Sequence, residues 1–130
     1  MHESSNAQSP PKGLTEALRQ EAAKVRELEQ QADRALHEDG DTARYTSLLG
    51  DKAELLSALP ETVQALLEEL PGTQREQTEE RLQSFAHSAD MALELESVFF
   101  MRQLLYPEDY EEGRDNDLEK LVRSLEGNDE

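Results

Sequence analysis

The chain has 130 residues, of which 30 are acidic and 13 basic, giving a formal net charge of −17 at pH 7. Such a charge repels the phosphates of nucleic acids and the anionic lipids of membranes, so we expect neither as a partner. Cysteine is absent, which excludes disulfides, thiolate catalysis and cysteine-based metal sites.

The composition predicts helices. Isoleucine is absent, and Leu, Val and Phe together make up 27 of the 130 residues, close to the level at which chains stay disordered. Few β-branched residues disfavour strands, whereas abundant Leu, Ala, Glu, Gln and Arg favour helices. We predict an all-α fold: an antiparallel bundle of three long helices and a short C-terminal amphipathic helix. Because the core is thin for a lone chain, we expect a homodimer.

The chain divides into three predicted parts. Residues 1–13, MHESSNAQSPPKG, lack the apolar region of a signal peptide and are expected to be a disordered tail. Residues 14–106 are expected to form the helical bundle domain, and residues 107–130 an acidic loop and the short helix. No apolar run reaches membrane-spanning length, so the expected location is the cytoplasm.

The first helix is expected over residues 15–37, where apolar residues recur at spacings of three, four and seven. This stripe consists of Leu14, Leu18, Val25, Leu28, Ala32 and Leu36. In the following EDGD, Gly40 favours the end of that helix and Asp41 is suited to cap the N-terminus of the next.

The second helix carries a leucine-rich face on both sides of Pro60. Its members are Tyr45, Leu48, Leu49, Leu55, Leu56, Leu59, Val63, Leu66, Leu67 and Leu70. Proline removes a backbone donor and clashes with the preceding turn, so we expect a kink or short break near Leu59. Lys52 also falls on this face. Either its stem covers the core while its ammonium reaches water, or it is a buried partner of an acid such as Glu29 or Glu96.

A third helix is expected from Thr73, which forms a capping box with Glu76, to Tyr106 before Pro107. One apolar stripe consists of Leu82, Ala86, Ala89, Leu93, Phe100 and Leu104. A second, on nearly the opposite side, consists of Met91, Leu95, Val98 and Leu105. A helix that is apolar all round is buried all round. The second stripe should therefore be covered by the C-terminal helix, by a second copy of the chain, or by both.

The C-terminal helix, DLEKLVRSLEG, is amphipathic, and one of its faces carries Leu118, Leu121, Val122 and Leu125. Asp115 is its expected N-cap and Gly127 its expected C-terminal stop. The loop PEDYEEGR would allow this helix to fold back onto the second stripe.

Few residues favour catalysis or metal binding. Counted from Asp115, the glycine that a calcium loop needs at its sixth position is replaced by Lys120. No Glu-x-x-His pair of a helical di-metal site occurs. We predict no catalytic residue, no metal site and no cofactor, and therefore not an enzyme. An alternative comes from Arg81 and His87, whose spacing resembles the signature of HEPN-type ribonucleases, an all-helical and dimeric family. That resemblance implies a ribonuclease or a nuclease-derived module.

Residues 35–59, ALHEDGDTARYTSLLGDKAELLSAL, resemble the central segment of the flagellar export chaperones that escort hook-associated proteins. Those chaperones are small, helical, cytoplasmic and usually acidic. Their hairpin has a leucine, an aspartate, a hydrophobic residue, a lysine and paired leucines, which here fall at Leu36, Asp41, Tyr45 or Leu48, Lys52, and Leu55 with Leu56. The resemblance covers about a fifth of the chain and implies chaperone-like binding of a client protein.

These observations favour a small, acidic, non-enzymatic helical interaction or adaptor protein. Its expected partner or dimer interface consists of Met91, Leu95, Val98, Phe99, Leu105 and Tyr106. A helical client would bind there by laying its apolar face into a groove. The acidic C-terminal segment would steer a basic partner towards the chain or discourage wrong contacts.

Overall fold

The structure is a computed structural model that describes residues 12–127. The regular elements in that range are all helices, which confirms the all-α prediction. They are α2 (Lys12–His37), α3 (Thr42–Thr62), the 3-10 helix η1 (Gln64–Glu69), α4 (Gly72–Glu94), α5 (Val98–Gln103) and α6 (Asp117–Glu126). The predicted tail lies outside the described residues as far as residue 11, and the described part begins in α2.

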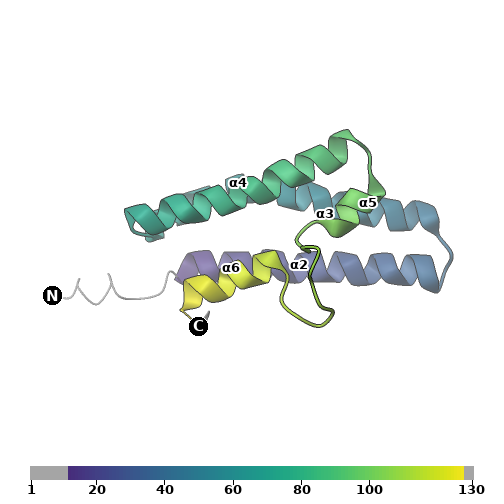
Figure 1. Cartoon of the computed structure of the whole chain (residues 1–130), viewed down its shortest axis with the longest axis horizontal. Coiled ribbons are helices and arrows are strands. Elements are labelled where there is room, and N and C mark those ends of the chain that lie inside the picture. The colour runs from purple at the N-terminus through teal and green to yellow at the C-terminus, as the bar shows by residue number, and fades with distance from the viewer. Residues whose placement is uncertain (1–11, 128–130) are drawn as a thin grey trace.

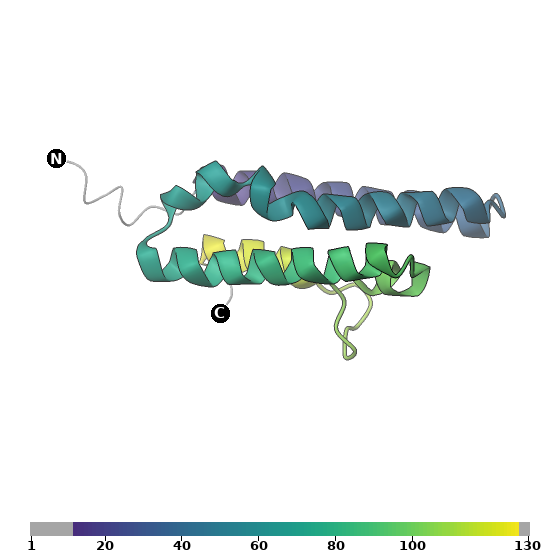
Figure 2. The same cartoon turned by 90° about the horizontal axis from the view of Figure 1, so that it is seen from above.

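The helices form two layers. α2 and α3 lie side by side in one layer, and α4 and α6 lie in the other (Figures 1 and 2). α4 packs against α3, α6 packs against α2, and α5 packs against α3 and α4. One continuous core cluster includes buried residues from all of these helices, so α6 belongs to the same core as residues 14–106.

The turn between α2 and α3 follows the prediction. Gly40 has φ of 61°, a left-handed conformation that glycine adopts without a steric penalty. Asp41 is the N-cap of α3, and its carboxylate accepts a hydrogen bond of 3.0 Å from the backbone N–H of Arg44. The predicted stripes of α2 and α3 are buried or half-buried, which accounts for the pairing of these two helices.

The predicted break near Leu59 comes a few residues later. α3 continues through Pro60 to Thr62 and ends at Val63, after which the chain forms η1. Proline disrupts the turn that precedes it, but its fixed φ is itself helical. Pro60 therefore lies in the last turn of the helix, which ends just beyond it.

The prediction of one continuous helix over residues 73–106 is wrong. α4 ends at Glu94, and the chain turns at Glu96, which has φ of 53°, before α5 begins. The apolar stripe on α4 follows alternating spacings of four and three through Leu82, Ala86, Ala89 and Leu93. The next position of this stripe is Glu96, a charged residue that interrupts the apolar face. The turn leaves Glu96 exposed.

Two predicted helix caps are also wrong. α4 begins at Gly72 with Pro71 as its N-cap, so Thr73 is already inside the first turn and cannot form the predicted capping box. The N-cap of α6 is Asn116 rather than Asp115, and it forms a capping box with Glu119. Asn116 is fully buried, where a neutral amide costs less than a carboxylate. Gly127 ends α6 in a left-handed conformation with φ of 80°, as predicted.

Candidate interaction surface

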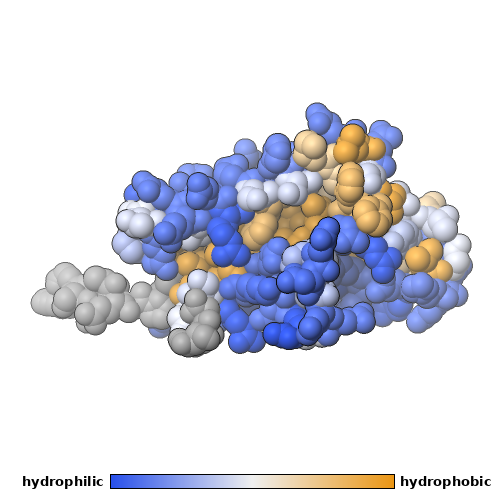
Figure 3. Space-filling view, viewed as in Figure 1, coloured by the Kyte–Doolittle hydropathy of each residue, from blue (hydrophilic) through white to orange (hydrophobic). Residues whose placement is uncertain are grey.

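Four large apolar side chains are exposed together where α4 meets α5. The exposed fractions are 45% for Met91, 57% for Leu95, 66% for Phe99 and 47% for Phe100. We term these four residues the apolar patch. In Figure 3, hydrophobic residues gather over α5 and in the hollow between α4 and α6, whereas most of the surrounding face is hydrophilic.

α5 directs its phenylalanines outward. Successive helical residues point about 100° apart, so three consecutive large side chains cannot all face the core. Met101 is buried and anchors α5, while Phe99 and Phe100 lie outside with their ring centres 5.7 Å apart. Ser97 caps the helix by accepting a hydrogen bond of 3.1 Å from the backbone N–H of Phe100.

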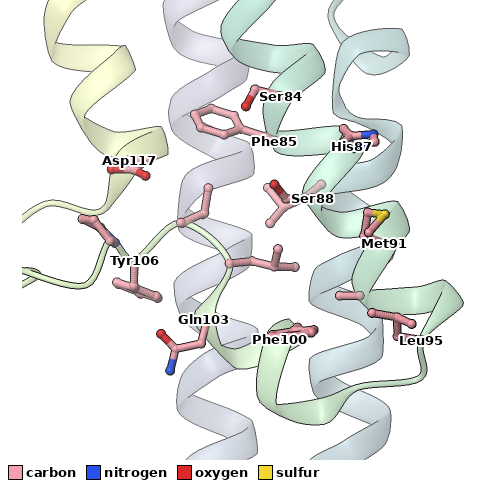
Figure 4. Close-up of a pocket in the computed structure, with 15 residues that line it drawn as sticks. Ser84, Phe85, His87, Ser88, Met91, Leu95, Phe100, Gln103, Tyr106 and Asp117 are labelled. Atoms are coloured by element: carbon pink, nitrogen blue, oxygen red, sulfur yellow. The ribbon is translucent and has the colours of Figure 1, made fainter.

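The patch borders a groove of about 540 Å³ between α4 and the start of α6. Ser84, Phe85 and Ser88 line it from α4, and Asp117 lines it from α6 (Figure 4). Leu56 of α3, which is fully buried, also lines it. α4 and α6 make little contact with each other, so this side of the two-layer fold remains open. Among the fifteen lining residues, one is acidic.

The predicted interface residues do not all share this surface. Met91, Leu95 and Phe99 are exposed, and Val98 is half-buried against the core. Leu105 is buried and Tyr106 is half-buried, and both line the groove. The sequence stripes also missed Phe100, which was assigned to the core face. The break at Glu96 changes the direction of the helix, so a register counted from α4 no longer applies to α5.

Lys52 is a buried partner of an acid, the second of its two predicted roles. Its side chain is 0% exposed, and Nζ lies 2.9 Å from a carboxylate oxygen of Glu29. Nζ also donates a hydrogen bond of 3.1 Å to the backbone carbonyl of Arg102. Burial lowers the pKa of Lys52, and the neighbouring Glu29 carboxylate offsets that effect only in part. The ammonium therefore holds α5 against α2 and α3 from inside the fold.

Tyr106 extends this contact into a polar network. Its hydroxyl donates to Glu29 at 2.7 Å and accepts a hydrogen bond of 3.1 Å from Arg26. Arg26 also donates to both carboxylate oxygens of Glu119, at 2.8 and 2.9 Å. Burial and the hydrogen bond to Glu29 both raise the pKa of Tyr106. The polar network, defined as Arg26, Glu29, Lys52, Tyr106 and Glu119, joins α2, α3, α6 and the loop after α5.

The ion pair between Arg26 and Glu119 predicts that the chain loses stability in acid. Burial alone would raise the pKa of Glu119, but hydrogen bonds from Arg26 and from the backbone of Asn116 lower it overall. A carboxylate with a lowered pKa in the folded state contributes stability at neutral pH and loses it as the pH falls through that pKa. From about pH 5 to 3, the unfolding free energy should therefore fall less steeply in Glu119→Gln than in the wild type. Urea titrations across this range would measure both slopes, and equal slopes would contradict the assignment.

The structure also locates the residues of the other candidate sites. Arg81 and His87, on which the ribonuclease alternative rests, are both exposed on α4, and the Arg81 guanidinium lies 6.0 Å from the ring centre of Phe85. Across residues 12–127, no group of three or more His, Asp or Glu side chains is arranged to hold a metal ion. None of the helices described there combines the length and apolarity needed to cross a bilayer.

The chain was compared with known proteins by sequence and by structure. No protein-family model, curated protein or solved structure matches it.

Proposed function

We propose that this chain is a non-enzymatic, cytoplasmic helical interaction protein that works as a homodimer, with the apolar patch as its contact face. The observation that carries the proposal is the joint exposure of Met91, Leu95, Phe99 and Phe100. The largest apolar patch on a typical soluble protein measures about 300–600 Å² and is often functional.

The size of the patch fits one side of a protein interface. Taking roughly 200 Å² for each large side chain, the exposed fractions correspond to apolar surface on the order of 400 Å². A standard interface buries about 800 Å² on each partner, somewhat more than half of it non-polar. The patch therefore supplies about the apolar share that one partner contributes.

The shape of this face favours a second copy as the occupant. A two-fold interface requires a self-complementary surface, and this face presents both projecting phenylalanines and an apolar groove beside them. Two chains of charge −17 repel each other. That repulsion is weakest where acidic residues are sparse, and Asp117 is the one acidic residue that lines the groove.

The proposal predicts that Phe99→Glu abolishes self-association. The side chain is two-thirds exposed, so the folded chain tolerates the charge, whereas a dimer contact would bury it without a partner. Light scattering should report a fall in molar mass from the dimer to the monomer, with an unchanged circular dichroism spectrum.

Ala65→Glu is the matched control, because it introduces the same charge at an exposed position on η1. This control should keep the dimer mass. If the two variants have the same mass, the patch is not the contact face.

The groove supports a second candidate, in which a helical client protein docks there. From Ser84 of α4 to Leu95, its C-cap, the groove extends along twelve residues, about 17 Å of helix, enough for roughly three turns of a bound helix. The resemblance to flagellar export chaperones favours such a role. If the wild-type chain is monomeric in solution, the groove is free, and this second candidate is favoured over the homodimer. The ribonuclease alternative would instead require RNA cleavage that is lost in Arg81→Ala or His87→Ala.

A further inference from the structure

The junction between α4 and α5 has an unfavourable backbone conformation. Glu96, with φ of 53°, and Leu105, with φ of 77°, are the two non-glycine residues between 12 and 127 with positive φ. They lie on either side of α5. Residues with a Cβ atom disfavour this conformation, and the residue types at 94–98 are otherwise compatible with a helix. The turn at Glu96 therefore depends on the contacts of the segment that follows it.

Those contacts are made largely with α2 and α3. The carbonyl of Arg102 accepts a hydrogen bond from Lys52, Tyr106 donates to Glu29, and Glu119 pairs with Arg26. The apolar face of α6 is buried and packs on α2. Its last turn is also joined to α2 by an ion pair between Glu126 and Arg19.

We propose that the α4–α5 junction is a hinge through which two copies of this chain exchange residues 98–127. The junction straightens, and α5, the loop and α6 of each copy pack on α2 and α3 of the other. This inference rests on the proposed homodimer and specifies how it forms. Exchange is a low-cost route to a dimer because the exchanged segment makes the same contacts in both states.

Three features favour the exchanged state. Straightening releases the left-handed conformation of Glu96. The polar network is preserved, because Arg26, Glu29 and Lys52 of one copy then bind Tyr106 and Glu119 of the second. Met91, Leu95, Phe99 and Phe100 surround the hinge and are exposed in a single chain. In the exchanged dimer these residues lie where the two chains cross, so the new contact between them buries the apolar patch.

Site-specific cross-linking tests the exchange, because the chain has no cysteine of its own. A chain carrying Arg19→Cys and a chain carrying Glu126→Cys would be unfolded together, refolded and treated with a short bismaleimide. Exchange predicts a covalent product of two chains, because position 126 of one chain then lies against position 19 of the other. Each variant treated alone is the control and should give little of this product.

The hinge itself is tested at Glu96. Glu96→Gly makes the turn favourable, since glycine adopts positive φ freely, and should reduce the covalent product by about tenfold. Glu96→Leu restores the apolar stripe of a continuous helix and should increase it. If Glu96→Gly and Glu96→Leu give equal yields of the covalent product, the proposal that Glu96 is the hinge is overturned.

Light scattering on the same samples separates the two proposals. If the samples have the mass of a dimer but give no cross-linked product of two chains, the exchange is overturned and the proposed homodimer is retained. A monomer mass at all concentrations would overturn both.

Discussion

Glu29→Gln is expected to lower the free energy of unfolding by about 3–5 kcal/mol, because it leaves the buried ammonium of Lys52 without its counter-charge. The substitution keeps the size of the side chain and an oxygen that accepts the hydrogen bond from Tyr106. The lost charge is thus the main change. Urea denaturation followed by circular dichroism at neutral pH would measure the effect. The difference in unfolding free energy between Glu29→Gln and the wild type should become smaller at alkaline pH. Burial lowers the pKa of Lys52, so Lys52 loses its proton at alkaline pH and no longer needs a counter-charge.

The double variant Lys52→Met/Glu29→Gln is the control for this interpretation. Methionine keeps an unbranched apolar stem in the core and removes the buried charge, and such replacements of buried ion pairs are often neutral or stabilising. The double variant should therefore be more stable than Glu29→Gln alone. If the effects of Lys52→Met and Glu29→Gln simply add, the two side chains are not coupled and the ion pair does not hold this part of the fold.

Leu56→Ala is expected to cost about 2–5 kcal/mol, the usual range for truncating a fully buried leucine. Leu56 is 0% exposed and lines the groove from α3, so its removal takes contacts from the core and enlarges the groove. Thermal and urea unfolding would both report the loss.

Leu95→Ala is the matched variant on the surface. More than half of Leu95 is exposed, so its truncation should change the stability of the folded chain by no more than about 0.5 kcal/mol. The same variant should weaken self-association, because Leu95 belongs to the apolar patch. A large loss of stability in Leu95→Ala, or none in Leu56→Ala, would contradict the assignment of these residues to surface and core.

Local sequence signals predicted much of the helical architecture. The apolar spacings located α2, the larger part of α3, and α6, because each of these helices buries a single face. Asp41 and Gly127 were identified as caps because N-cap and C-terminal stop preferences act within one turn of a helix. The prediction of an N-cap at Asp115 failed by one residue, since the choice between Asp115 and Asn116 depends on the burial of Asn116 against the rest of the fold.

The end of α4 could not be predicted from helical preference, because residues 94–98 suit a helix. What decides the turn is the position of Glu96 on the apolar stripe and the packing of α5 on α3. Phe100 was placed on the wrong side for the same reason. The pattern offered two roles for Lys52 without choosing between them, because Glu29 is distant in sequence and meets Lys52 only when α2 and α3 pack together.

The candidate site was predicted in part. Met91, Leu95 and Phe99 were expected at an interface because a second apolar stripe on one helix needs a cover, and the structure leaves them exposed. α6 does not cover them, because it packs on α2. The groove could not be foreseen, since it depends on the distance between α4 and α6.

The most direct test of the proposed function is the molar mass of the unmodified chain, measured by light scattering over a concentration series. A second copy on the apolar patch predicts twice the chain mass of 14.7 kDa, falling towards one chain only on strong dilution. A mass of 14.7 kDa that stays constant up to the highest concentration would contradict the homodimer.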